Sequence, residues 1–240
     1  MKRLRPTQQE TLSAAAIIGK HLSPTRLSIQ KGLSDIVGAT IYVKEEYESP
    51  VRSFKARGAL TLTEHLAAQG KISRVLTAST GNHGSAMAYA CSQYGLPLTI
   101  GVPVGADESK VALIKKFGVD LEFIGRDLDE TKKLMLRRSL PSGHVFIEDG
   151  DCPQIVAGTS TIGREIVREL SGIDMVLVPV GNGALIGGIG SAVKAFDASV
   201  KVIGVQSEGA PCMTLSFQAG KPLDTKELNT FATGMAVRVS

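Results

Sequence analysis

The sequence predicts an α/β fold, because short β-branched stretches alternate with longer amphipathic stretches along most of its 240 residues. Strands that alternate with helices form βαβ units with parallel sheets and right-handed crossovers. The 26 glycines fall in clusters, which is typical of loops whose backbone approaches another group closely. Ligands bind beyond the carboxyl ends of parallel strands, so we expect functional residues in the strand-to-helix loops.

The helices are predicted from apolar residues that recur with helical periodicity. The first begins with a capping box, in which Thr7 is the N-cap and Glu10 lies three residues on. The predicted helices are 7–22, 53–69, 83–94, 109–117, 128–139, 156–170 and 186–196. The predicted strands are 39–44, 74–77, 98–102, 120–124, 145–147, 175–180 and 200–205.

Composition and charge narrow the possible functions. The net charge of +4 is spread along the chain and only 5% of residues are aromatic, so we expect no nucleic-acid partner. Cys91, Cys152 and Cys212 are widely separated, which gives neither a disulfide framework nor metal-ligand spacing. The start of the chain is not typical of a signal peptide, and no apolar stretch approaches a membrane span. A cytoplasmic protein without a membrane partner is therefore expected.

The first notable loop, residues 49–59, leads into a predicted helix and carries Lys55 near the helix start. The positive end of the helix dipole favours the neutral, nucleophilic amine that Schiff-base chemistry requires. The alternative is an ordinary solvated lysine, which this loop alone does not exclude.

The second loop, residues 77–84, gathers hydroxyls, an amide and two glycines between a strand and a helix. This combination predicts an anion site for a carboxylate or phosphate. The alternative is a simple helix cap with Ser79 or Thr80 as N-cap and His83 on the first turn.

The third loop, residues 180–188, follows an apolar strand with small residues that let backbone amides approach a phosphate. It differs from a dinucleotide fingerprint, because the third glycine comes one residue late, at Gly187. An acidic residue at the expected distance is also poorly matched, with only Glu208 as a candidate. The loop therefore favours a phosphate over a nicotinamide dinucleotide.

In order and spacing, the three loops resemble those of the fold-type-II pyridoxal-phosphate enzymes, especially the serine/threonine dehydratase branch that includes hydroxyectoine-utilisation dehydratases. The matching segments are 53–59, 79–84 and 181–185. The resemblance implies a two-lobed, tryptophan synthase β-like fold with three-layer αβα lobes and parallel-rich sheets. Residues 1–75 and 151–240 would form a large cofactor-binding lobe, and residues 76–150 a small inserted lobe.

The resemblance also assigns roles. Lys55 would hold pyridoxal 5′-phosphate as a Schiff base and later move the substrate α-proton, while Phe54 packs near the cofactor ring and Asn82 bonds its hydroxyl. The phosphate would be held by the backbone amides of Gly181, Asn182, Gly183, Ala184 and Leu185. The substrate carboxylate would be received by Ser79, Thr80, Asn82 and His83. The implied reaction is β-elimination of water from a serine- or threonine-like amino acid, followed by release of a 2-keto acid and ammonia.

Some positions depart from the family pattern. Thr80, which the resemblance places with Lys55 as a catalytic residue, occupies the position where related racemases carry a serine. Its β-branched side chain is restricted, so efficient racemisation is not expected. The positions of the family's divalent-metal site match Gln206 and Cys212, which are poor ligands for a hard cation, so no metal is expected.

The end of the chain also matters, because family members usually continue beyond the segment that matches residues 233–237. That part normally supplies a serine or cysteine to the pyridine nitrogen, so we expect an incomplete large lobe here. Relatives suggest a homodimer. Two alternatives stay open: β-replacement or another fold-type-II lyase chemistry, and a non-catalytic, truncated remnant.

Overall fold

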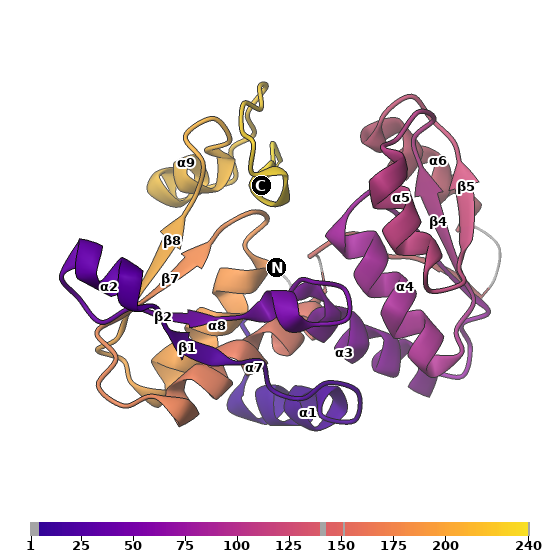
Figure 1. The fold of residues 1–240 in the computed structure, drawn as a ribbon. Helices are drawn as coiled ribbons and strands as arrows, with labels where there is room; N and C mark the ends of the chain where they lie inside the picture. The colour runs from indigo at the N-terminus through magenta and orange to yellow at the C-terminus, as the bar shows by residue number, and fades with distance from the viewer. Residues whose placement is uncertain (1–4, 140–142, 151, 240) are drawn as a thin grey trace. The chain divides into compact units, whose positions relative to one another are not determined.

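The computed structural model describes residues 5–139, 143–150 and 152–239, and these fold into two compact units. One unit comprises residues 13–148, and the other comprises residues 1–12 together with 149–240. The order of helices and strands along the chain can be followed in Figure 1. The α/β class and its parallel-rich sheets are confirmed.

The unit of residues 13–148 is built on a four-stranded sheet in the order β5-β4-β3-β6, in which every neighbouring pair is parallel. Its strands are β3 (Arg74–Ala78), β4 (Leu98–Val102), β5 (Asp120–Phe123) and β6 (His144–Phe146). Its helices are α3 (Lys55–Ala68), α4 (Asn82–Tyr94), α5 (Glu108–Lys115) and α6 (Leu128–Arg138). Each lies within a few residues of its predicted range.

Helices cover both faces of this sheet. Leu76 and Ala78 of β3 pack with Met135 of α6, whereas Thr77 between them points the other way and contacts His83 of α4. Successive side chains of a strand alternate between faces, so α4 and α6 lie on opposite sides of the sheet. The result is a helix–sheet–helix arrangement whose central strands are buried.

In the same unit, strand β2 (Tyr42–Lys44) lies within the predicted strand 39–44, whereas β1 (Leu27–Ile29), α2 (Lys31–Val37) and the 3₁₀ helix η1 (Glu46–Glu48) were not predicted from the sequence. Strands β1 and β2 pair antiparallel around α2, and η1 follows. Strand β1 is only three residues long, and α2 buries none of its residues. Leu33, Ile36 and Val37 do recur at helical spacing in α2, but its seven residues are shorter than the window over which such a periodicity predicts a helix.

The other unit begins with the predicted capping box on α1 (Gln8–Ile18), a helix that continues into the first unit. The Thr7 amide donates to Glu10 Oε2 at 2.6 Å, and the Glu10 amide donates to Thr7 Oγ1 at 3.1 Å. This reciprocal pair confirms the capping box. The remaining elements are α7 (Pro153–Glu169), β7 (Met175–Pro179), α8 (Ala184–Phe196), β8 (Lys201–Val205), α9 (Cys212–Ala219) and η2 (Thr233–Met235).

Helices α7 and α8 pack backbone to backbone. A Cβ atom on Gly188 of α8 would lie 2.7 Å from the Ser160 amide nitrogen, and one on Gly163 of α7 would lie 2.7 Å from the Ile189 carbonyl oxygen. Only glycine fits at these two positions.

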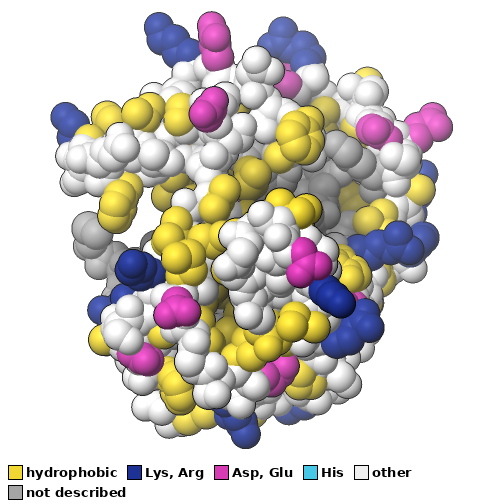
Figure 2. All heavy atoms as spheres, turned by 60° about the vertical axis from the view of Figure 1, so that its left-hand side comes forward, with side chains coloured by type: hydrophobic (Ala, Val, Ile, Leu, Met, Phe, Trp, Pro, Cys, Tyr) yellow, Lys and Arg dark blue, Asp and Glu magenta, His cyan; other side chains and the backbone are white. Residues whose placement is uncertain are grey.

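Strands β7 and β8 form a two-stranded parallel sheet with apolar side chains at the surface. Leu177, Ile203 and Val205 are all more than a third exposed. Figure 2, which brings the left-hand side of Figure 1 forward, shows hydrophobic side chains across this face of the molecule. Among the described residues, no helix is both long and apolar enough to cross a membrane.

The predicted lobes and the compact units place residues 13–75 differently. Residues 13–75 share a compact unit with residues 76–148, and α3 packs against α4 within it. The second predicted boundary, at residue 151, lies outside the described residues, next to the unit boundary at 148/149. The lobe assignment stays a prediction.

Candidate active site

Lys55 is the first residue of α3, as the sequence predicted to within two residues. Its amine lies over the ring of Phe54, with Nζ 5.3 Å from the ring centroid. Both side chains are half-buried. The amine is therefore positioned at the positive end of a helix, beside an aromatic face that favours a nearby cation.

The start of α3 is held by the preceding loop and not by an N-cap side chain. Phe54 occupies the N-cap position without a side-chain hydrogen bond. Ser49 Oγ instead accepts from the Ser53 amide at 3.0 Å and donates to the Ser53 carbonyl oxygen at 2.8 Å. Between them, Arg52 has a φ of 53°, the left-handed region that side-chain-bearing residues rarely adopt.

The loop between β3 and α4 is organised by Ser79. Its Oγ accepts from the Gly81 amide at 3.1 Å and from the Gly84 amide at 3.0 Å. With both lone pairs used, the Ser79 hydroxyl can offer only its proton to a further group. The N-cap residue is Gly81, so the alternative of Ser79 or Thr80 at that position is wrong, although Ser79 does accept from the first turn.

Thr80 and Asn82 lie at the rim of this loop, where Thr80 is half-buried and Asn82 is exposed. Both side chains are thus accessible beside the amides of the first turn of α4, which have no partner within the helix. The arrangement suits an anion that accepts hydrogen bonds.

His83 is buried, and its proton position follows from its contact with the sheet. Thr77 Oγ1 donates its only proton to the Ile147 carbonyl oxygen at 2.8 Å. Its 3.0 Å contact with His83 Nε2 must therefore be one in which the Nε2–H donates. The donor nitrogen of a neutral His83 ring is consequently occupied by Thr77.

The glycine-rich loop belongs to the other compact unit, at the N-terminus of α8. Gly183 is the N-cap with a φ of 88°, which places successive amides in an orientation that L side chains rarely permit. The Ala184 amide donates to Asn182 Oδ1 at 3.2 Å, and Asn182 Nδ2 donates to the Asp149 carbonyl oxygen at 3.1 Å. A Cβ atom on Gly181 would lie 3.1 Å from the Gly234 carbonyl oxygen, so a larger residue would crowd this loop.

The two positions considered for a metal are engaged with protein atoms. Gln206 Oε1 accepts from the Thr214 amide at 2.9 Å, and Cys212 Sγ donates to the Val237 carbonyl oxygen at 3.1 Å. The expectation of no metal stays a prediction.

The residues fit a phosphorylated aldehyde cofactor in chemical terms. One unit offers an amine at a helix start with a loop of hydroxyls and an amide, and the other offers a glycine loop at a helix N-terminus. The fold and these two sets of residues define an α/β protein of the class that binds a small, phosphate-bearing cofactor.

The particular family is given by comparison: the chain belongs to the pyridoxal-phosphate dependent enzymes, whose family model matches residues 18–240. It is 37% identical to the L-threonine ammonia-lyase of Thermotoga maritima over 214 residues, which are 89% of this chain and 53% of that protein. It is 35% identical to the biosynthetic L-threonine dehydratase of Pasteurella multocida over 89% of this chain and 42% of that protein. The chain thus spans about half the length of these curated relatives.

Solved structures agree with the family assignment. The processed threonine deaminase isoform 2 of Solanum lycopersicum matches with a TM-score of 0.89 and 32% identity, over 99% of this chain and 71% of that chain. The serine racemase of maize matches with a TM-score of 0.92 and 27% identity, over 97% of this chain and 70% of that chain. The resemblance to fold-type-II enzymes of the threonine dehydratase branch is confirmed.

Two residues of the site were not identified from the sequence. Thr77 fixes the ring of His83, and Glu46 pairs with Arg57 two residues after Lys55. Arg57 is the signal that could have led to Glu46. An arginine that becomes buried on a helix needs an acidic partner, so a search for that partner was warranted.

Proposed function

We propose that this chain belongs to a pyridoxal-phosphate dependent dehydratase, an ammonia-lyase that eliminates water from serine- or threonine-like amino acids. The products are a 2-keto acid and ammonia. The proposal is supported by the similarity to an L-threonine ammonia-lyase. The observation that carries it is the Ser79-centred loop, because it offers hydroxyl and amide donors for a carboxylate in the same unit as Lys55.

Each residue has a task in this proposal. When bound, pyridoxal phosphate supplies the electron sink for the reaction. Lys55 binds the cofactor through its amine and moves the substrate α-proton, and Phe54 packs near the cofactor ring. Asn82 donates to the ring hydroxyl. The loop of residues 181–185 holds the phosphate through backbone amides, and Asn182 Oδ1 already orients the Ala184 amide.

The substrate carboxylate is received at the start of α4. Ser79 and Thr80 donate their hydroxyl protons, and Asn82 and His83 contribute the amides of the first turn. His83 acts through its backbone amide, because Thr77 takes the Nε2–H of its ring. The β-branched Thr80 restricts the position that a racemase fills with serine, which favours elimination over racemisation.

We further propose the setting of this activity. Residues 1–75 with 151–240 form the large lobe and residues 76–150 the small lobe of a cytoplasmic homodimer with an amino-acid substrate and no metal. The three scattered cysteines support a reducing compartment.

The test is an assay of 2-keto acid released from L-threonine and L-serine in the presence of pyridoxal phosphate. Lys55→Ala is expected to abolish product and to remove the cofactor label that borohydride fixes on residue 55. Lys71→Ala, which alters an exposed lysine of the same unit, is the matched control and keeps both.

Other outcomes identify the alternatives. Product formed only with an added thiol or other nucleophile would indicate β-replacement, and D-serine from L-serine would indicate racemisation. A label on Lys55 without turnover would indicate a cofactor-binding remnant. An unlabelled chain without turnover contradicts the proposal.

A further inference from the structure

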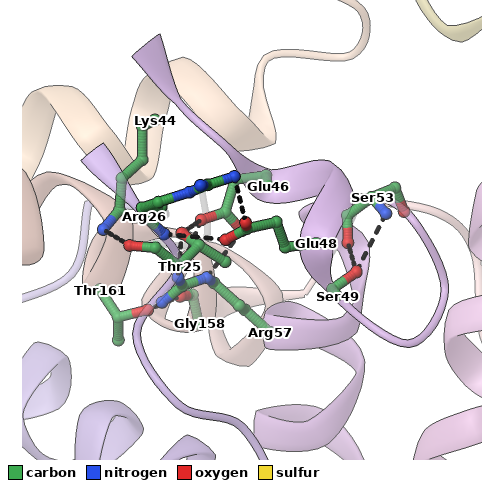
Figure 3. Close-up of polar contacts among 10 residues, drawn as sticks. All are labelled: Thr25, Arg26, Lys44, Glu46, Glu48, Ser49, Ser53, Arg57, Gly158 and Thr161. Carbon is green, nitrogen blue, oxygen red and sulfur yellow. Dashed lines mark hydrogen bonds and ion pairs between the residues drawn. The ribbon is translucent and has the colours of Figure 1, made fainter. Parts of the chain in front are cut away.

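A short segment, Glu46–Ser49, contacts the chain on both sides of Lys55, and we refer to it as the brace. Ser49 bonds to Ser53, two residues before Lys55, and Glu46 bonds to Arg57, two residues after it. Figure 3 shows both contacts, with the brace joined to Ser53 before α3 and to Arg57 within it.

The contact on the far side of Lys55 is a largely buried, bidentate ion pair. Arg57 Nε donates to Glu46 Oε2 at 2.8 Å, and Arg57 Nη2 donates to Glu46 Oε1 at 2.8 Å. The Arg57 side chain is 3% exposed and that of Glu46 is 15% exposed. Two parallel bonds fix the direction of a guanidinium as well as its distance, which a single contact does not.

Thr25 forms hydrogen bonds with both members of this ion pair. Its Oγ1 donates to Glu46 Oε1 at 2.6 Å and accepts from Arg57 Nη2 at 3.3 Å. The carboxylate and the guanidinium are therefore both bonded to a third group, so the pair has little freedom to move.

The contact on the near side is the reciprocal bonding of Ser49 with the backbone of Ser53. It secures the turn in which Arg52 has a φ of 53°. Backbone in that region persists only where neighbouring contacts hold it. The Ser49 contact thus fixes the chain direction with which Lys55 enters α3.

A second group of ions involves Glu48 of the brace and Glu45 just before it, and it serves as an internal comparison. Arg26 pairs with Glu48 at 2.9 Å and with Glu45 at 2.7 Å, and its side chain is 66% exposed. A hydrogen bond from Ser28, followed by bonds from Tyr47 and Arg26, lowers the pKa of Glu45. These contacts link the brace to residues 26–28 and do not touch α3.

We propose that Glu46 and Arg57 are positioning residues that hold the amine of Lys55 in its reactive direction, an inference that rests on the proposed role of Lys55. The first residue of a helix without a capping side chain is prone to fraying, and a lysine side chain has many rotamers. A buried ion pair contributes little net stability compared with apolar residues of similar size. The Glu46–Arg57 ion pair next to Lys55 is therefore better explained by the direction that it imposes on the start of α3.

The decisive variant is Glu46→Met/Arg57→Met, which removes both charges and leaves no buried charge unpaired. Arg57→Lys keeps the charge but loses the bidentate geometry. Arg26→Met removes an ion pair from the same brace without touching α3 and is the matched control. Urea unfolding of every variant establishes that it is folded before the comparison is made.

The readout is the rate at which pyridoxal phosphate becomes covalently attached to Lys55, trapped with borohydride and located by peptide mass, over a range of pH. Misplacement of a reacting group by about 1 Å slows a reaction by up to about 100-fold. We expect the double Met variant to be about 10-fold to 100-fold slower, Arg57→Lys to lie between it and the wild type, and Arg26→Met to stay within about twofold. A pH profile that moves only in the α3-facing variants is also expected.

The positioning role is overturned if the folded double Met variant attaches cofactor at the wild-type rate and with the wild-type pH profile. A wild type that attaches no cofactor to Lys55 contradicts the proposed function instead. In that case the competitive acetylation rate of the Lys55 amine, measured without cofactor, decides the positioning role. A change in the double variant but not in Arg26→Met supports it, and equal rates in all variants overturn it.

Discussion

Strands β4 and β8 both end in the tripeptide Ile-Gly-Val, yet their surroundings differ completely. In β4, Ile100 and Val102 are both 0% exposed. In β8, the equivalent Ile203 and Val205 are 40% and 47% exposed. The same local sequence therefore gives one strand of a closed core and one strand at a surface.

The difference comes from the neighbours of each strand. Strand β4 pairs with β3 and β5 and contacts both α4 and α6. Within the described residues, β8 pairs with β7 alone, and α8 contacts both strands. Parallel sheets are stable when both faces are covered, so the burial of a strand depends on what the rest of the sheet provides.

The largest expected effect is on the isoleucines. Ile100→Ala should lower the free energy of unfolding by about 2–5 kcal/mol, because it leaves a cavity in a packed core. Ile203→Ala should cost less than about 1 kcal/mol, since much of that side chain is already in water. Urea unfolding measures both changes in free energy. Tyrosine fluorescence reports only on the unit of residues 13–148, which contains Ile100, because all 4 tyrosines lie within it. Equal costs for the two variants would contradict the comparison.

A smaller difference is expected at the glycines of the two strands. A Cβ atom on Gly101 would lie 2.9 Å from both Met135 Sδ and Thr131 Cγ2, and Thr131 is held by two hydrogen bonds. A Cβ atom on Gly204 would meet only the ends of the Val180 and Ile186 side chains, at 2.8 and 3.1 Å. We expect Gly101→Ala to cost about 1–3 kcal/mol and Gly204→Ala about half as much or less, by the same unfolding measurement. A larger cost at Gly204 would show that β8 is the more tightly packed strand.

The smallest expected effect is a pH dependence confined to the unit of residues 13–148. Burial, and next the nearby carboxylate of Glu64, raise the pKa of Tyr94 to about 12. Because the pKa is raised in the folded state, the contribution of Tyr94 to the free energy of unfolding is fully present below the ordinary tyrosine pKa, near 10. It is lost as the pH rises towards 12. Tyr94→Phe should flatten this alkaline loss by less than about 1 kcal/mol, because solvent screens a partly exposed group. Unfolding free energies measured between neutral and alkaline pH test this, and identical slopes in both proteins would contradict it.

The sequence predicted those parts of the fold that depend on nearby residues. The limits of β4 match the prediction at both ends, and the capping box of Thr7 and Glu10 is confirmed. Helix α2 was missed although Leu33, Ile36 and Val37 recur at helical spacing, because seven residues are too few for that pattern to predict a helix. A helix of that length depends on contacts that the local sequence does not reveal.

The same limit applies to the candidate site. The loops that carry Lys55 and Ser79 were found because their chemistry lies in consecutive residues. Glu46 was missed because its partner Arg57 is 11 residues away, and no spacing rule joins a carboxylate of one element to an arginine of the next at that distance. The roles predicted for the loop residues remain to be tested by the experiments above.

The backbone contact between α7 and α8 limits how this protein can vary. Gly188 and Gly163 meet main-chain atoms, which have no rotamers with which to yield, so an added methyl group has nowhere to go. Asn182 and Ala184, on the loop that precedes and starts α8, are constrained in another way, because the Ala184 amide donates to Asn182 Oδ1 and Ala184 is buried. A library of variants should therefore keep glycine at 163 and 188, and at 182 it should retain side chains that accept a hydrogen bond. The packing of α8 thus restricts residues outside the glycine loop as strictly as hydrogen bonding restricts residues within it.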